Sequence, residues 1–595
     1  MKSSHFKKIL TALVLVALSV LEVRAGAVVL RHHLKIRLLP AENMLTGIDE
    51  IRVQTRGEAV LNFNLSQRAK VKRVEVNGRS LKLLFKKGNL RIPLATDERT
   101  GVIKIKIAYQ GVFDDPVPVM PVNTDNPGYG VTGIISEKGS FLLSGAGWYP
   151  EIPGSHPAFT LDVNAPAGVF AVTAGKLSGH ETDGKRTRSA WVVNHPVDGL
   201  SLSAARYRVR EKQAGKVKAM TYMLPENDHL SESYLNAVVR YISDYETLFG
   251  SYPFDKFAVV ENFFPTGYGF PSYTLLGSRV LRLPFIIRTS LGHEIAHCWW
   301  GNGVYVDYEK GNWCEGLTTY VSDYRFKEKI SDGAAREYRR QWLRNFATLV
   351  NPENDFPLSQ FKSRYDPVTR AIGYDKGAMV FHMLRIRLGE AVFWGTLRDL
   401  YRDNLFQKVS WVDLQAAFER RGNRSLEQFF TQWVYRKGAV QLSLEGMSKT
   451  LSGDSWKMKG HLVQQQPLYN TTLKLKLEGG YGHTETEVIL SGRDTPFEIV
   501  GKELPERITV DPDFDVFRML YPSEIPSQVN SLKGSSSVLV VLAKGVSLKT
   551  KNTARLLVAS LGLRQVRFIS EKSLINDDLN RKDILIVGFP TRQDL

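Results

Sequence analysis

The chain has 595 residues, of which 24% are charged and 10% are aromatic. This composition excludes an intrinsically disordered chain, and the length predicts several domains that each bury a core. The net charge of +18 raises nucleic-acid binding as a function, but Lys and Arg are spread along the whole length without a recognisable nucleic-acid module. We therefore expect no nucleic-acid partner. Solvated surface charge explains the excess, with weak attraction to a membrane or envelope surface as the alternative.

The first 25 residues have the plan of a secretory signal peptide. Three lysines precede an apolar run over residues 9–21, and Val23-Arg24-Ala25 offers a cleavage site with small residues. The run is short for a membrane span, although an uncleaved anchor is an alternative. We expect export to the periplasm or the extracellular space.

Residues 26–212 are rich in short alternating segments separated by Gly, Pro and Asn. Examples lie at 33–39, 71–78, 101–111 and 158–166. Many strands with few helices are typical of an antiparallel β domain, either a saddle or a sandwich.

The periodicity changes near residue 213. Residues 230–249 carry apolar side chains at helical spacing and end at Gly250. A turn and an apolar strand, SYPFDKFAVVEN, follow this helix, and further helices run to about residue 437. We expect a mixed α/β domain over residues 213–439.

The most informative stretch of this domain contains the motif H-E-x-x-H at His293, Glu294 and His297. Four helical residues advance about 400°, so the two imidazoles emerge on one face and can reach one metal ion. Glu294 is placed to contact a water molecule rather than the metal. Glu315, which begins a second predicted helix, is a candidate third ligand of a zinc ion. The alternative is a core helix whose histidines are satisfied by hydrogen bonds.

The two cysteines, Cys298 and Cys314, stand next to His297 and Glu315. A disulfide between the two ligand-bearing helices and a pair of buried free thiols are both compatible with the sequence. Neither cysteine is a good zinc ligand, because each projects about 100° away from its neighbouring ligand.

Alternation returns over residues 440–522 and predicts a small β-sandwich. Residues 523–595 begin with a Ser-rich linker and continue with a strand (537–542), a helix (551–561) and a strand (583–587). One β-α-β unit cannot cover a sheet face by itself, so we expect an incomplete α/β domain.

The segments HEIAHCWWGN and NWCEGLTTY resemble the M1 family of zinc metallopeptidases, which includes the membrane alanyl aminopeptidases. The resemblance implies one zinc ion bound by His293, His297 and Glu315, with Glu294 as general base. Seventeen residues separate His297 from Glu315, where the family usually has eighteen. It also implies a multidomain α+β fold, in which a thermolysin-like catalytic domain follows the N-terminal β domain.

Two further residues gain a role from the resemblance or from their position. The segment IGYDKGAMVFHML is similar to the family's Tyr-x-Lys-Gly segment, which implies that Tyr374 stabilises the oxyanion of the tetrahedral intermediate. Without the resemblance, a tyrosine packing at the start of a helix is favoured. Asp323 either orients a metal ligand or is an exposed helix carboxylate.

Recognition of the substrate departs from the family pattern. M1 aminopeptidases carry Gly-x-Met-Glu-Asn, whose Glu grips the substrate's free α-amino group. The corresponding stretch here holds Gly267, Tyr268, Gly269 and Phe270 and has no acidic residue. We expect these four residues to bind an extended peptide through their backbone.

The predicted function is therefore zinc-dependent hydrolysis of peptide bonds, related to aminopeptidase activity but without the amine-binding Glu. The alternative is a zinc-retaining, catalytically weak protein that binds envelope peptides as a scaffold. The presence of both Glu294 and Tyr374 favours the enzyme, because a binding protein needs neither.

Overall fold

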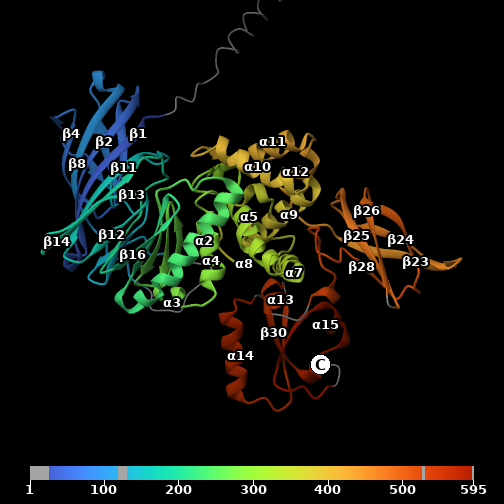
Figure 1. Ribbon diagram of the computed structural model, residues 1–595. Helices are drawn as coiled ribbons and strands as arrows, with labels where there is room; N and C mark the ends of the chain where they lie inside the picture. Colours follow the sequence, from blue (N-terminus) through green and yellow to red (C-terminus); the bar gives the residue numbers. More distant parts are fainter. Residues whose placement is uncertain are drawn as a thin grey trace, which may run out of the picture.

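The computed structural model describes residues 26–117, 130–480, 482–525, 529–535, 537–563 and 565–592. The predicted signal peptide, residues 1–25, lies outside the described residues. Figure 1 shows four bodies: a β domain in blue and teal, a central body rich in helices, a second β domain in orange and a small α/β domain in red. Within the described ranges, no helix combines the length and apolar character needed to cross a membrane.

The N-terminal domain is built on an eight-stranded sheet with one buried face. In β1, for example, Leu34, Ile36 and Leu38 are buried while Lys35 and Arg37 are exposed, as alternation in a half-covered strand requires. All pairs in the sheet are antiparallel except β1 with β11, which are parallel. The strands, in order across the sheet, are β13 (Lys176–Thr182), β14 (Arg186–Val193), β11 (Ala158–Pro166), β1 (Val28–Leu39), β2 (Met44–Arg56), β8 (Thr100–Val112), β4 (Lys70–Val76) and β5 (Arg79–Ser80).

Two smaller sheets complete this domain and share its core. One holds β12 (Phe170–Val172), β15 (Leu202–Ala205), β10 (Gly139–Leu142) and β9 (Gly133–Ser136), and the other holds β3 (Val60–Asn64), β7 (Asn89–Pro93) and β6 (Phe85–Lys86).

A five-stranded sheet leads into the central body. Its order is β16 (Arg208–Ala214), β17 (Val217–Met223), β18 (Lys256–Asn262), β20 (Tyr273–Gly277) and β19 (Gly267–Phe270). Every residue of β18 is buried, which explains its continuous apolar run. The short strand β19 pairs only with β20 and forms the edge of the sheet.

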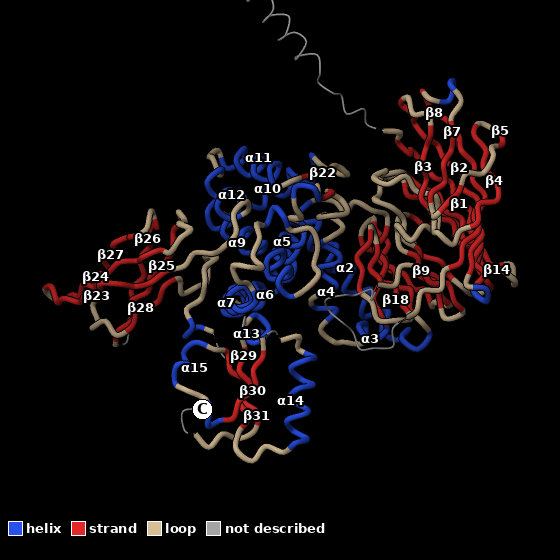
Figure 2. Tube along the Cα trace, turned by 180° about the vertical axis from the view of Figure 1, so that it is seen from behind, coloured by secondary structure: helices blue, strands red, loops and turns tan. Residues whose placement is uncertain are grey.

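Helices make up most of the central body (Figure 2). The helix α2 confirms the periodicity seen in the sequence, and α4 and α5 carry the candidate metal ligands. Two π-helical turns, Thr319–Tyr324 and Ala371–Lys376, interrupt the succession. The helices are α2 (Ser231–Phe249), α3 (Ser278–Leu281), α4 (Ser290–Ala296), α5 (Cys314–Thr318), α6 (Arg325–Ile330), α7 (Asp332–Leu349), α8 (Pro367–Arg370), α9 (Gly377–Leu388), α10 (Glu390–Asp403), α11 (Trp411–Gly422) and α12 (Glu427–Trp433). A parallel pair of short strands, β21 (Tyr305–Val306) and β22 (Lys408–Val409), lies among them.

The predicted sandwich consists of two three-stranded antiparallel sheets. One has the order β23 (Leu442–Ser452), β24 (Ser455–Gln464) and β27 (Asp494–Gly501), and the other has the order β26 (Gly482–Leu490), β25 (Thr471–Gly479) and β28 (Arg507–Val510).

The last domain is larger than the single β-α-β unit predicted from the sequence. Three parallel strands form its sheet, with β29 between β30 and β31. The prediction from the sequence missed β30, because the short segment VRFIS mixes Arg and Ser with apolar residues and lacks the continuous apolar run of β29. Figure 1 shows α14 and α15 on either side of the sheet. The elements are α13 (Val529–Gly534), β29 (Val538–Leu542), α14 (Leu548–Ser560), β30 (Val566–Ser570), α15 (Asn576–Arg581) and β31 (Asp583–Val587).

A close approach between two glycines sets the position of α5. A Cβ atom on Gly316 would lie 2.7 Å from the Cα of Gly377, the first residue of α9. Because no side chain fits there, glycine at both positions lets the helix that carries Glu315 lie directly against α9.

We predict that Gly316→Ala destabilises the central body by about 1–3 kcal/mol, because the added methyl group overpacks this contact. Calorimetry should show a lower unfolding temperature. The control is Gly333→Ala in α7, where the nearest atom to the added methyl group would be 3.8 Å away and no loss is expected. An unchanged transition in Gly316→Ala would contradict the close approach.

Candidate zinc centre

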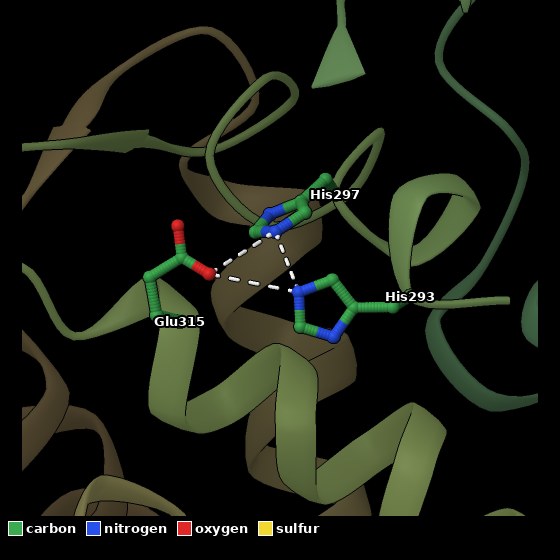
Figure 3. Close-up of side chains that lie close together, drawn as sticks. All are labelled: His293, His297 and Glu315. Atoms are coloured by element: carbon green, nitrogen blue, oxygen red, sulfur yellow. Dashed lines mark hydrogen bonds and ion pairs between the residues drawn. The ribbon is translucent and has the colours of Figure 1, made fainter. Parts of the chain in front are cut away.

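The two histidines of the H-E-x-x-H motif face the same side of α4 (Figure 3). The helix ends at Ala296, and His297 caps its C-terminus. One helical turn separates the two rings, which brings the Nε2 atoms of His293 and His297 to 3.1 Å from each other. The side chains are 12% and 14% exposed. Both nitrogens therefore point into one small, largely enclosed space.

Glu315 on α5 supplies the third donor atom. Its Oε2 lies 3.6 Å from His293 Nε2 and 3.4 Å from His297 Nε2. Dashed lines mark both contacts in Figure 3. This oxygen is buried and has no hydrogen-bond partner among the described residues. The prediction that these three residues converge is thus met by the geometry.

The donor set fits a zinc ion. Ligands that lie about 2.0–2.1 Å from a tetrahedral ion are about 3.3–3.4 Å apart, close to the three separations measured here. Two imidazoles and one carboxylate leave the fourth position open, as a catalytic zinc site requires. A buried carboxylate oxygen without a donor is unfavourable unless a cation faces it.

The other ring nitrogens are fixed by hydrogen bonds. His293 Nδ1 lies 3.0 Å from Asp323 Oδ2, and His297 Nδ1 lies 3.0 Å from the carbonyl oxygen of Trp300. When the imidazoles are neutral, both acceptors accept a hydrogen bond from Nδ1–H, so the lone pairs of both Nε2 atoms face the site. Of the two roles considered for Asp323, the structure agrees with the one in which Asp323 orients a metal ligand.

The π-helical turn Thr319–Tyr324 explains how Asp323 reaches the site. Asp323 follows Glu315 by eight positions, which would place the two carboxylates about 80° apart on a regular helix. A π-helical turn absorbs one residue, so the offset falls to about 20° and both side chains face α4. The sequence carried no signal for this turn, nor for the Trp300 carbonyl group.

The charges in the cluster keep Glu315 ionised. Burial raises its pKa, but the two imidazoles outweigh that effect and hold the pKa well below the usual range. Burial lowers the pKa of His293, but Asp323 and Glu315 raise it to about 9. An ionised carboxylate is the form that binds a metal ion.

Glu294 lines the same cavity and sits against strand β19. Burial raises the pKa of its carboxyl group, while the two neighbouring imidazoles partly offset the rise. A Cβ atom at position 269 would overlap its Oε2 atom. Gly269 is therefore needed for Glu294 to occupy this place beside the strand.

Tyr374 lies in the π-helical turn Ala371–Lys376, just before α9. Its ring is nearly parallel to that of His293, with an angle of 8° and a centroid separation of 6.3 Å. Burial raises the pKa of the phenol well above its usual range, and the charge of Glu315 raises it further. Tyr374 thus keeps its proton at neutral pH and can donate a hydrogen bond.

The cavity around these residues has a volume of about 540 Å³. Three of the four residues predicted to bind the substrate, Gly267, Tyr268 and Gly269, line it. Phe270 does not, because its ring packs instead on Tyr268 and Tyr273. Several other lining residues were not predicted from the sequence: Ser290, Gly301, Asn302, Tyr308, Ser363, Arg364 and Arg370.

Both cysteines are buried free thiols, so the disulfide alternative is wrong. Cys298 Sγ accepts a hydrogen bond from the hydroxyl group of Tyr252 at 3.3 Å. Cys314 Sγ lies 3.5 Å from His297 Nδ1, and Cys314 also lines the cavity.

Comparison with known proteins agrees with this geometry. Residues 286–433 match the Peptidase family M1 domain. The chain is 23% identical to the alanine/arginine aminopeptidase of Saccharomyces cerevisiae, over 51% of this chain and 38% of that protein. It is 29% identical to aminopeptidase M1 of Arabidopsis thaliana, over 26% of this chain and 18% of that protein. The chain thus spans less than two fifths of the length of these relatives.

Solved structures share the fold over a larger part of the chain. The M1 zinc metallopeptidase from Deinococcus radiodurans aligns with a TM-score of 0.57 and 20% identity, over 69% of this chain and 94% of that one. A mutant of the same enzyme bound to a Tyr-Ser-Ala substrate aligns with a TM-score of 0.55 and 19% identity, over 69% of this chain and 95% of that one.

An H-E-x-x-H helix with a glutamate from the next helix, set in a mixed α/β domain, defines a zinc metallopeptidase fold. Within that class, residues 286–433 are similar to the Peptidase family M1 domain. The resemblance seen in the sequence is confirmed, and the metal that it implies is zinc.

We predict that the metal-free protein takes up about one zinc ion per chain. Asp323→Asn should weaken zinc binding about 10- to 100-fold, because the neutral amide replaces the anionic acceptor that orients the His293 ring. Competition with a chromogenic chelator measures the affinity. Asp332→Asn, at the exposed start of α7, is the matched control and should bind zinc as the unchanged protein does. Equal affinities in all three proteins would contradict this role of Asp323.

Proposed function

We propose that the protein is a zinc-dependent peptidase that hydrolyses peptide bonds in the cavity beside β19. The observation that carries the proposal is the convergence of His293, His297 and Glu315, with Glu294 and Tyr374 at the same cavity. A zinc ion held by the three ligands would supply Lewis acidity, which polarises a carbonyl group and acidifies water. The chain's own side chains supply the proton transfers and the hydrogen bonds described next.

Glu294 is proposed as the general base. Its carboxylate takes a proton from the attacking water and returns it to the nitrogen of the leaving amine. The raised pKa of this buried group brings it closer to neutrality, where a base that must also act as an acid works best. Gly269 leaves the carboxylate room beside the strand on which we place the substrate.

Tyr374 is proposed as the donor to the oxyanion that develops on the scissile carbonyl. Its phenol is protonated at neutral pH, and its ring lies parallel to that of His293 at the wall of the cavity. A fixed donor in a largely enclosed site stabilises developing negative charge more than water does, because it needs no reorganisation.

The edge strand β19 is proposed to hold the substrate backbone. Its Gly267–Gly269 part lines the cavity, and it pairs with β20 on one side only. An extended peptide can therefore add to the sheet through main-chain hydrogen bonds. A structural neighbour from Deinococcus radiodurans is bound to a Tyr-Ser-Ala substrate, which agrees with a peptide as ligand of this fold.

We propose an activity related to that of the aminopeptidases, in which no carboxylate on β19 binds the substrate. Residues 267–270 contain no acidic side chain. The nearby Glu261 on β18 is fully buried and accepts hydrogen bonds from the Leu224 backbone N–H and the Asn227 side chain. It is therefore engaged in the core and is no substitute.

We also propose that the protein is exported and works in the periplasm or outside the cell, on the basis of residues 1–25. The excess of basic residues supports a weak association with a membrane or envelope surface.

We predict that Glu294→Gln keeps its zinc but hydrolyses peptides about 100- to 10,000-fold more slowly, because the amide cannot accept the proton. Tyr374→Phe should lower kcat about 100- to 1,000-fold, because the oxyanion loses a donor. Metal analysis and peptide hydrolysis followed by chromatography measure both effects.

Tyr338→Phe is a control for Tyr374→Phe, because Tyr338 is a partly buried tyrosine on α7 outside the cavity. A zinc-loaded protein that binds peptides but cleaves none would favour the scaffold alternative. Full activity in Glu294→Gln would show that the base is elsewhere.

A further inference from the structure

The cavity holds an unusual set of charges for a site that receives a free amino terminus. Three acidic residues line it in the described structure: Glu294, Glu315 and Asp323. Glu315 belongs to the donor cluster, Asp323 is hydrogen-bonded to His293, and Glu294 is the proposed base. The other charged residues in the lining are two arginines, Arg364 and Arg370.

Arg370 ends helix α8 and lies beside Tyr374. Its guanidinium carbon is 5.9 Å from the centre of the Tyr374 ring, and its Nη1 atom is 3.6 Å from Asp375 Oδ1. The Asp375 carboxylate is buried and also accepts a hydrogen bond from Asn345, whereas the Arg370 side chain is 38% exposed. The guanidinium group of Arg370 thus contacts the buried Asp375 carboxylate, and the exposed part of the Arg370 side chain lines the cavity.

The local sequence explains why Arg370 points there. Asp366 caps α8 by accepting a hydrogen bond from the Thr369 backbone N–H at 2.7 Å, and Pro367 occupies the first helical position. This short capped helix fixes the direction from which Arg370 enters the site. Arg364 lies two residues before the cap and lines the same cavity.

Both guanidinium groups lie at the cavity that holds the residue proposed to donate to the oxyanion. Arg370 lies over the ring of Tyr374, and Arg364 lines the same cavity. A substrate whose scissile carbonyl reaches Tyr374 therefore has its neighbouring groups close to two positive charges.

We propose that this cleft selects substrates that carry a carboxylate near the scissile bond, held by Arg364 and Arg370, and that it does not require a free α-amino group. The carboxylate is either an acidic side chain or the carboxyl end of a short peptide. This inference rests on the proposed peptidase function and specifies its substrate class.

The physical reason is the difference between the two ends of a peptide. An ammonium group would enter a cavity with two guanidinium groups and no carboxylate that is free of another role, so its desolvation would go largely uncompensated. A carboxylate would gain charge-assisted hydrogen bonds from planar guanidinium groups, which match its two oxygens.

The test uses the zinc-loaded full chain and versions of one short peptide. Four versions combine a free or acetylated amino end with a free or amidated carboxyl end, and a further pair places Gln or Glu next to the scissile bond. We expect acetylation to change kcat/KM by less than about threefold. We expect a carboxylate in one of the two positions to raise kcat/KM about tenfold or more. The two sets of peptides distinguish the source of the carboxylate.

Arg364→Gln should remove most of this advantage, mainly through a higher KM for the carboxylate peptides. Arg398→Gln is the matched control: Arg398 is exposed on α10 and outside the cavity, so the same charge is lost without effect on the preference. Because Arg370 also contacts the buried Asp375, the variant at position 370 must keep its positive charge, and Arg370→Lys is used. It keeps the charge but loses the planar fork, and should reduce the advantage in part.

The outcomes separate the inference from the function on which it rests. Cleavage only of peptides with free amino ends, equal rates for carboxylate and amide peptides, or an unchanged preference in Arg364→Gln would overturn the inference and leave the peptidase in place. No hydrolysis of any peptide by the zinc-loaded chain would overturn the proposed function itself.

Discussion

One buried oxygen organises the centre of this molecule. Oε2 of Glu315 lies within 3.6 Å of the Nε2 atoms of both histidines and has no hydrogen-bond donor among the described residues. In the neutral imidazoles that bind a metal ion, the Nδ1–H groups donate to Asp323 and to the Trp300 carbonyl group, so Nε2 presents a lone pair and not a donor to this oxygen. A cation between the three atoms satisfies all of them at once, and the remaining features of the site are arranged around that requirement.

The backbone reaches this arrangement through glycines and π-helical turns. Gly316 and Gly377 let α5 lie directly against α9, so Glu315 and Tyr374 enter the cavity from neighbouring elements. Gly269 gives Glu294 its place beside the edge strand. The turn at Thr319–Tyr324 brings Asp323 onto the face of Glu315, and the turn at Ala371–Lys376 carries Tyr374. Such turns occur mostly as single-turn bulges within α-helices and are frequent at functional sites.

Much of this could be predicted from the sequence, because spacing and periodicity decide it. The H-E-x-x-H motif places His293 and His297 on one helical face, and the alternating segments indicate the β domains correctly. What the sequence could not supply depends on three-dimensional packing. The π-helical turn decides between two roles for Asp323, and the distance between the cysteines decides whether they form a disulfide. The short segment of β30 lacks the continuous apolar run of its neighbour β29, so the prediction from the sequence missed that strand. By contrast, the capped helix that ends at Arg370 could have been predicted from Asp366-Pro367, a typical N-cap followed by proline at the first helical position.

The most direct test of the central claim is the position of zinc in crystals grown with one equivalent of the metal, located by anomalous scattering at the zinc edge. A single peak about 2.0–2.2 Å from Nε2 of His293, Nε2 of His297 and a carboxylate oxygen of Glu315 is the result expected here. A principal peak on Cys298 or Cys314, or a zinc ion that leaves Glu315 unbound, would contradict the account.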